Sequence, residues 1–78
     1  MNDHYVMLYL NQASTEFTIT ARKKSARLPQ VTRQAKLLGY KPILLAHRLT
    51  KVSAESMKRM ICSAYANAGY TYNTRPPL

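Results

Sequence analysis

The residues of this sequence that could do chemistry are its cations. Lys and Arg number twelve, Asp and Glu number three, and the formal net charge of the 78-residue chain is +9. Between Phe17 and Ala54 there are nine Lys or Arg residues and no acidic residue. A charge field of one sign repels itself in a folded domain, so it favours an anionic partner. The alternative is a basic surface that serves only solubility, for which proteins usually use mixed signs.

Seven of these cations fall within 20 residues and form the candidate binding site. They are Arg22, Lys23, Lys24, Arg27, Arg33, Lys36 and Lys41. Lys and Arg in such a run, with Ser, Thr and Gln nearby, suit contacts to the phosphates of DNA or RNA. Tyr40, Tyr70 and Tyr72 would be stacking platforms for bases if they are exposed, or they would close a small core. We expect a nucleic-acid-binding surface here, and a solvated basic face is the alternative.

The other reactive side chains predict neither catalysis nor a cofactor. The two histidines and the single cysteine lack the paired spacing of zinc sites. Only Asp3, Glu16 and Glu55 could supply the carboxylates of a hydrolase, and Glu55 has a role at a helix start. Two glycines are too few for a glycine-rich phosphate loop. We therefore expect a non-enzymatic protein without a metal ion or other cofactor.

Two predicted strands precede the basic run. His4–Asn11 is apolar or aromatic on both alternating faces, which predicts a central strand. Asn11–Thr15 is polar and suits a hairpin loop. Glu16–Ala21 alternates apolar residues with threonines, which predicts a half-buried strand antiparallel to the first. The basic run thus begins where the second strand ends.

A short helix is predicted within the basic run. Pro29 suits its first turn, and Gly39 suits its end. Its apolar stripe consists of Val31, Ala35 and Leu38. A third strand follows over Ile43–Leu49, with Pro42 at its start, where proline is tolerated.

The strongest helical pattern covers Ser53–Gly69. Ser53 is the expected N-cap, and Val52 with Met57 occupies the positions of a hydrophobic staple. Gly69 is placed to end the helix. Its expected buried face consists of Met57, Met60, Ile61, Ala64, Tyr65 and Ala68.

Together these elements predict an α+β fold in the order β-β-α-β-α, with a small, mainly antiparallel sheet of three strands and two helices. We expect residues 1–74 to form one compact domain and residues 75–78 to form a flexible C-terminal tail. Tyr70 and Tyr72 either add a short edge strand or pack over the sheet. The sequence shows no signal peptide and no apolar run long enough for a bilayer, and one cysteine cannot form an internal disulfide. We therefore expect a cytoplasmic protein without a membrane partner.

Three stretches resemble the GIY-YIG nuclease domain. Tyr5–Asn11 (YVMLYLN) resembles its opening strand, and Phe17–Leu28 (FTITARKKSARL) resembles its second strand and the basic segment that follows. Lys41–Tyr72 resembles its third strand and second helix. The resemblance places Arg27 near the arginine of the family and Asn73 near its closing asparagine.

The sequence departs from that family at two places that matter for catalysis. Thr-Ile-Thr stands where the family has the glycine of its YIG motif. No acidic residue lies near Lys58–Ile61, where the resemblance would place the metal-binding glutamate. Without this carboxylate a divalent ion has no anchor. The resemblance therefore implies a degenerate, binding-only relative.

Three functions follow from these observations, in decreasing order of support. The first is a small non-enzymatic nucleic-acid-binding protein that grips phosphates with its basic strand-to-helix segment. The second is a small basic interaction or inhibitor protein, of the kind found in phages or mobile elements, that docks on an acidic surface of a larger protein. The third is a GIY-YIG-like nuclease. The sequence leaves open DNA against RNA, sequence specificity and the oligomeric state.

Overall fold

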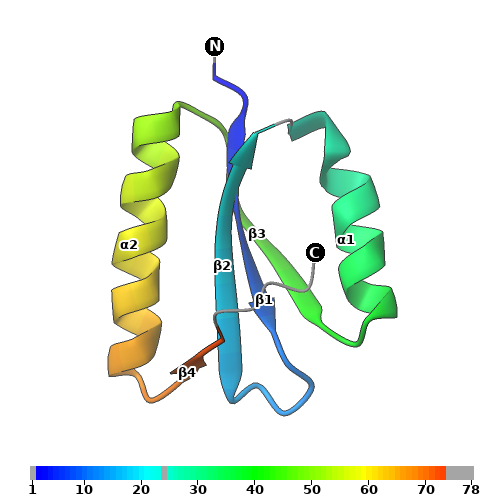
Figure 1. Cartoon of the computed structure of the whole chain (residues 1–78), viewed down its shortest axis with the longest axis vertical. Coiled ribbons are helices and arrows are strands. Elements are labelled where there is room, and N and C mark those ends of the chain that lie inside the picture. Colours follow the sequence, from blue (N-terminus) through cyan, green and yellow to red (C-terminus); the bar gives the residue numbers. More distant parts are fainter. Residues whose placement is uncertain (1, 24, 74–78) are drawn as a thin grey trace.

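The computed structural model describes residues 2–23 and 25–73 of the chain. Its elements are β1 (His4–Leu10), β2 (Glu16–Lys23), a 3₁₀ turn (Ser25–Arg27), α1 (Leu28–Leu37), β3 (Lys41–Leu49), α2 (Lys51–Asn67) and β4 (Thr71–Tyr72). The two helices cover opposite faces of one sheet, so the molecule has three layers (Figure 1). The predicted α+β class is confirmed. The predicted C-terminal tail, residues 75–78, lies outside the described residues.

The sheet has the strand order β3-β1-β2-β4. β1 is central and pairs antiparallel with β2 and β3, whereas β2 pairs in parallel with β4. The predicted number of three strands is therefore wrong, because the sheet has four strands, and the parallel pairing of β2 with β4 makes it mixed. The chain after α2 adds the fourth strand: the amides of Thr71 and Asn73 donate to the carbonyls of Thr15 and Phe17 at 2.9 and 2.8 Å.

The α2 face of the sheet carries an aliphatic and aromatic core. The buried side chains on this face are Val6, Leu8, Phe17 and Ile19, and Ala54 of α2 packs among them. Partly buried residues of α2, β3 and the C-terminal segment surround this cluster. The alternating pattern of β2 therefore points its larger apolar side chains at α2, as hydrophobic alternation predicts.

The α1 face of the sheet carries a second, more aromatic core. Tyr5, Met7 and Tyr9 of β1 are buried there together with Ala35 of α1. Thr18 and Thr20 of β2 are buried as well, and the register places them opposite Tyr9 and Met7. β1 is thus buried on both faces, which confirms its prediction as the central strand.

α2 begins earlier than predicted. Its N-cap is Thr50, which has extended backbone and accepts a hydrogen bond on its side chain from the Ser53 amide at 3.1 Å. Ser53 therefore lies inside the first turn and is not the cap. Val52 follows Lys51 within the helix and is 78% exposed, so it forms no hydrophobic staple with Met57.

The buried face of α2 is narrower than predicted. Met57, Ile61 and Tyr65 pack against the core around Ala54, as the helical spacing requires. Met60 is 67% exposed, and Ala64 and Ala68 are exposed too. The contact line runs through Ala54, at the first turn, and Met60 and Ala64 lie about 120° and 80° around the helix from it. Ala68 follows the last helical residue, Asn67. The helix ends at Asn67, before Gly69 at φ 98°, close to its predicted end.

Candidate nucleic-acid interface

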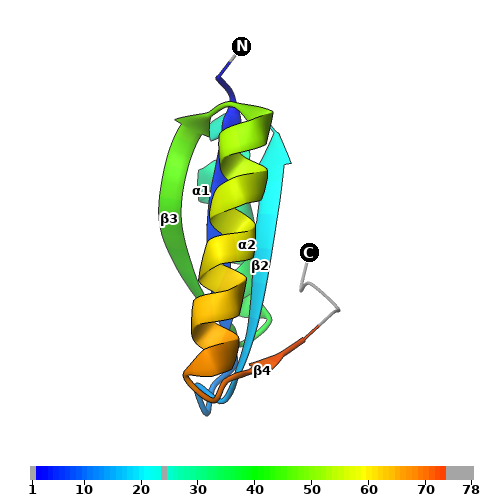
Figure 2. The same ribbon diagram turned by 90° about the vertical axis from the view of Figure 1, so that its left-hand side faces the viewer.

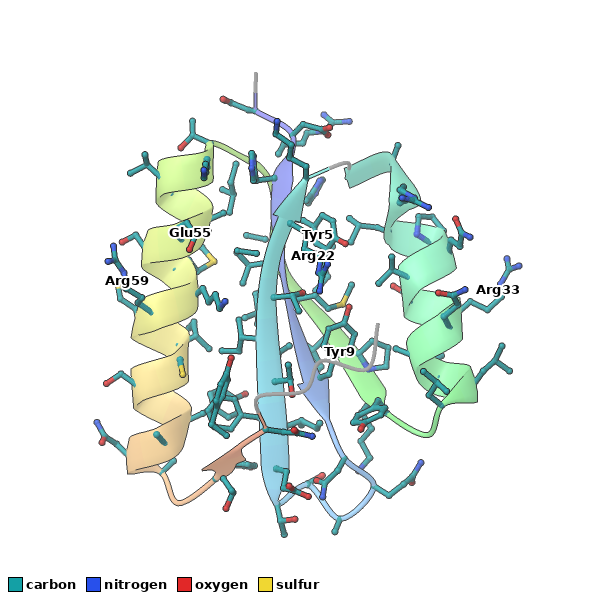
Figure 3. The ribbon with its side chains drawn as sticks, viewed as in Figure 1. Tyr5, Tyr9, Arg22, Arg33, Glu55 and Arg59 are labelled. Carbon is teal, nitrogen blue, oxygen red and sulfur yellow. The ribbon has the colours of Figure 1, made fainter. Side chains whose placement is uncertain are left out.

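A cavity of about 570 Å³ lies between α1 and the sheet, beside the C-terminal end of β2. It is lined by Tyr5, Tyr9, Arg22, Lys23, Arg27, Gln30, Val31 and Gln34. Figure 3 shows Tyr5, Tyr9 and Arg22 in the space between β2 and α1. Three lining residues are cations and none of those described is a carboxylate. The cavity therefore suits an anionic ligand.

The strand register positions the first cation. Arg22 lies directly opposite Tyr5 in the antiparallel β1–β2 pair, so both side chains belong to the α1 face of the sheet. β2 extends to Lys23, two residues beyond its predicted end, because Arg22 and Lys23 pair with Tyr5 and His4. The backbone of Arg22 and Lys23 is thus held in a paired strand and not in a loop.

The turn after β2 brings in the third cation. Residues Ser25–Arg27 form a single 3₁₀ turn, and α1 follows at once with Pro29 in its first turn. Arg27 therefore borders the same cavity as Arg22. Gln30 and Gln34 are one helical turn apart on the face of α1 that lines the cavity, and their amides can donate hydrogen bonds to a ligand.

The floor of the cavity contains two tyrosines. Tyr5 and Tyr9 belong to β1 and are almost fully buried. Burial raises the pKa of Tyr9, and the Thr20 hydroxyl and the Arg22 guanidinium offset part of this rise. The Tyr9 hydroxyl therefore keeps its proton at neutral pH and can act as a neutral hydrogen-bond donor.

A second, smaller cavity of about 260 Å³ continues past the edge of β2. Thr18–Arg22 of β2, Lys58 of α2 and Tyr72 of β4 line it. Arg22 borders both cavities. β4 pairs only with Glu16 and Phe17, so within the described ranges no strand pairs with the outer side of β2, away from β1, from Thr18 onward. We call Arg22, Lys23, Arg27 and Lys58 the basic edge.

The structure separates the other predicted cations from this edge. Arg33 is exposed and points away from the sheet in Figure 3. Lys36 is exposed further along α1 and borders neither cavity. Lys41 pairs opposite Leu10 at the other end of the sheet, where its Nζ donates to Ser14 Oγ at 3.0 Å. Lys24 lies outside the described residues. Of the six predicted residues that the structure describes, three therefore line one cavity.

The three tyrosines considered as stacking platforms also differ in position. Tyr40 packs against the α1-face core. The ring of Tyr70 lies 5.0 Å from that of Tyr65, within the α2-face core. Tyr72 is the most exposed of the three and borders the second cavity, with its ring 5.2 Å from that of Phe17. Of these rings, that of Tyr72 is best placed to meet a ligand.

Sequence reasoning missed four lining residues: Tyr5, Tyr9, Gln30 and Gln34. The tyrosines looked like core residues of a central strand, and they are buried, but their polar ends border a cavity. The glutamines offered a usable signal, because a spacing of four places two amides on the same face of a helix. Lys58, which lines the second cavity, was missed as well, because it lies outside the run of cations at residues 22–41.

Neither helix of the described chain is long and apolar enough to cross a membrane. Across residues 2–23 and 25–73, no group of three or more His, Cys, Asp or Glu side chains is arranged to hold a metal ion. Comparison with family models, with curated proteins and with solved structures found no match for this chain.

Proposed function

We propose that this protein binds nucleic acid without cleaving it, and that the basic edge grips the phosphates. The observation that carries the proposal is the convergence of Arg22, Lys23 and Arg27 on one cavity, with no carboxylate among its described lining residues. If these cations only kept the surface solvated, nothing would require them to line the same cavity. Phosphate oxygens suit this set, because guanidinium groups bind them in bidentate fashion and lysine adds a mobile charge.

The second cavity extends the same interface. A nucleic-acid strand that leaves the first cavity across β2 would meet Lys58 and the ring of Tyr72 next. Aromatic rings stack on bases of any sequence, and cations follow the backbone, as in proteins that bind single strands. We therefore expect single-stranded DNA or RNA to bind at least as well as duplex DNA, with little sequence preference.

Binding without cleavage is favoured by the positions of the carboxylates. Glu16 begins β2, at the opposite end of that strand from Arg22. Glu55 is exposed on α2, whereas the first cavity lies on the α1 side of the sheet (Figure 3). Neither group is placed to anchor a divalent ion beside bound phosphate, and Asp3 borders a separate small cavity with His47 and Arg48. The resemblance to the GIY-YIG domain stays a prediction, and this arrangement fits its binding-only form.

The test is a salt titration of binding to labelled single-stranded and duplex oligonucleotides. Each phosphate contact releases counterions, so log K should fall with log salt at about −0.9 per contact on duplex DNA and about −0.7 on single strands. Lys23→Ala with Arg27→Ala should make the slope shallower by about 1.5–2 and weaken all sequences alike. The matched control, Arg33→Ala with Lys36→Ala, removes the same charge away from the cavity and should leave the slope nearly unchanged.

Two results would contradict the proposal. One is the absence of binding at 50 mM salt to every oligonucleotide tested. The other is an equal loss of affinity in both double variants, which would show that net charge alone attracts the nucleic acid. Cleavage of the oligonucleotides in Mg²⁺ or Mn²⁺, abolished by EDTA and by Glu16→Gln or Glu55→Gln, would favour the nuclease alternative instead.

The alternative of docking on an acidic protein has one observation in its favour. Ile43, Leu44 and Met60 are exposed apolar side chains away from the basic edge. Protein partners use such side chains together with charge, and their binding is less sensitive to salt than phosphate contacts are. Ile43 and Leu44 belong to β3, and Met60 belongs to α2.

A further inference from the structure

β3 is the outermost strand on one side of the sheet. It pairs with β1, and no strand of the described chain pairs with its other side. Figure 2 shows β3 at the margin of the sheet, away from β2. Its outward backbone amides and carbonyls are therefore placed to pair with an added strand.

Protection against such pairing lies on both sides of Ile43 and Leu44. The strand begins with Lys41 and Pro42, and both residue types discourage pairing at an edge. The pairing with β1 is irregular between Leu44 and Ala46 and again before Leu49, and Arg48 has φ 57°. Ile43 and Leu44 themselves carry no charge, proline or irregularity.

The central side chains of β3 are apolar and partly open to solvent. Ile43 is 40% exposed and Leu44 is 45% exposed. The register places Ile43 opposite Leu8, on the α2 side, and Leu44 opposite Met7, on the α1 side. An added strand would therefore bury apolar surface on both faces of the sheet.

The charges around β3 select the partner. Lys41 precedes the apolar centre, and Arg48 and Lys51 follow it, with no acidic residue between Lys41 and Lys51. Asp3 borders the same small cavity as Arg48 and offsets one of these charges. A second copy of this chain would bring a strand with the same cations and no carboxylate of its own. A strand with carboxylates at its ends would complement both ends of β3.

We propose that β3 receives an extended segment of a partner protein, apolar at its centre and acidic at its ends, as an added strand. β3 forms one edge of the sheet, whereas the part of β2 that borders the second cavity lies toward the opposite edge. The site at β3 is therefore independent of the basic edge, and both sites can be occupied at once.

The experiment uses ¹⁵N-labelled protein and a capped synthetic peptide, Asp-Glu-Val-Ile-Val-Ile-Glu-Asp. Amide shifts and slowed hydrogen exchange should concentrate in residues 43–46. Two control peptides should fail to bind: one with lysines in place of the four acids, and one with prolines in place of both isoleucines. Leu44→Lys should weaken binding about tenfold or more, because it removes a leucine that the peptide would cover and adds a charge.

The matched variant is Leu37→Lys, which makes the same change at an exposed leucine of α1 and should leave peptide binding unchanged. The mapping of amide shifts uses the wild-type protein, so this part of the test does not depend on whether Leu44→Lys or Leu37→Lys folds. Shifts at Arg22–Arg27 alone, or equal binding of the proline peptide, would show attraction by charge only and would overturn the proposal. A dimer of the protein alone that Leu44→Lys abolishes would assign β3 to a second copy and would also overturn it.

Discussion

The two faces of the sheet are built for different tasks. On the α2 side, aliphatic and aromatic side chains of β1 and β2 pack against a 17-residue helix with a side-chain cap at Thr50. On the α1 side, tyrosines and threonines meet a ten-residue helix that has no side-chain cap hydrogen bond at Arg27, and a cavity remains between them. The comparison indicates that α2 carries most of the stability, whereas the α1 side leaves a cavity, in which we propose that the ligand binds.

The largest expected effect tests the α2 layer. Ile61→Ala should cost about 2–3 kcal/mol, the lower part of the range for buried isoleucine, because Ile61 is only partly buried. Met60→Ala, one residue away and mostly exposed, should cost less than about 0.5 kcal/mol. Urea denaturation of both variants is the measurement. Equal losses would mean that α2 is rotated from its described position.

A smaller effect is expected at the helix cap. Thr50→Ala removes the acceptor for the Ser53 amide and should cost about 1 kcal/mol. Ser53→Ala keeps that acceptor and loses only the hydroxyl contact with Thr50, so its cost should stay below about 0.5 kcal/mol. Thermal unfolding of the two variants compares them directly. A larger loss for Ser53→Ala would restore Ser53 as the cap.

The smallest effect belongs to the α1 layer and depends on pH. Burial places the pKa of Tyr9 in the folded state above its unfolded value of about 10. Above about pH 10 the unfolded chain therefore releases this proton more readily, and stability falls as pH rises further. Tyr9→Phe should reduce that alkaline loss, whereas Tyr72→Phe, at an exposed ring, serves as control. Identical alkaline melting curves for wild type and Tyr9→Phe would argue against a buried Tyr9.

Local patterns in the sequence were sufficient for much of the fold. The apolar character of β1 on both faces predicted a central strand, and the spacing of Met57, Ile61 and Tyr65 predicted the buried side of α2. β4 was harder, because a strand of two residues is defined by its partner and not by its own pattern. Sequence reasoning had left open whether Tyr70 and Tyr72 pair or pack, and here Tyr70 packs while Tyr72 pairs.

The candidate site was predictable only in part. The cations that end β2 and precede α1 are close in sequence, so chain proximity alone brought Arg22, Lys23 and Arg27 together. Whether Arg33 and Lys36 join them depends on the rotation of α1, which is set by how Val31 and Ala35 pack on the tyrosines of β1. Tyr5 and Tyr9 border the cavity because of the register between β1 and β2, which no local pattern encodes.

The irregular pairing of β3 allows the length of this strand to change without an exchange of its faces. Between the pairs Met7–Leu44 and His4–Leu49, β1 advances three residues and β3 advances five. The excess consists of two single-residue irregularities, one on each side of Ala46, and Leu49 still packs in the α2-face cluster together with Leu45. Deleting one residue from 45–48 would remove one irregularity and leave Leu49 opposite His4, on the same face. We therefore expect homologous sequences to tolerate the loss of one or two residues in this segment.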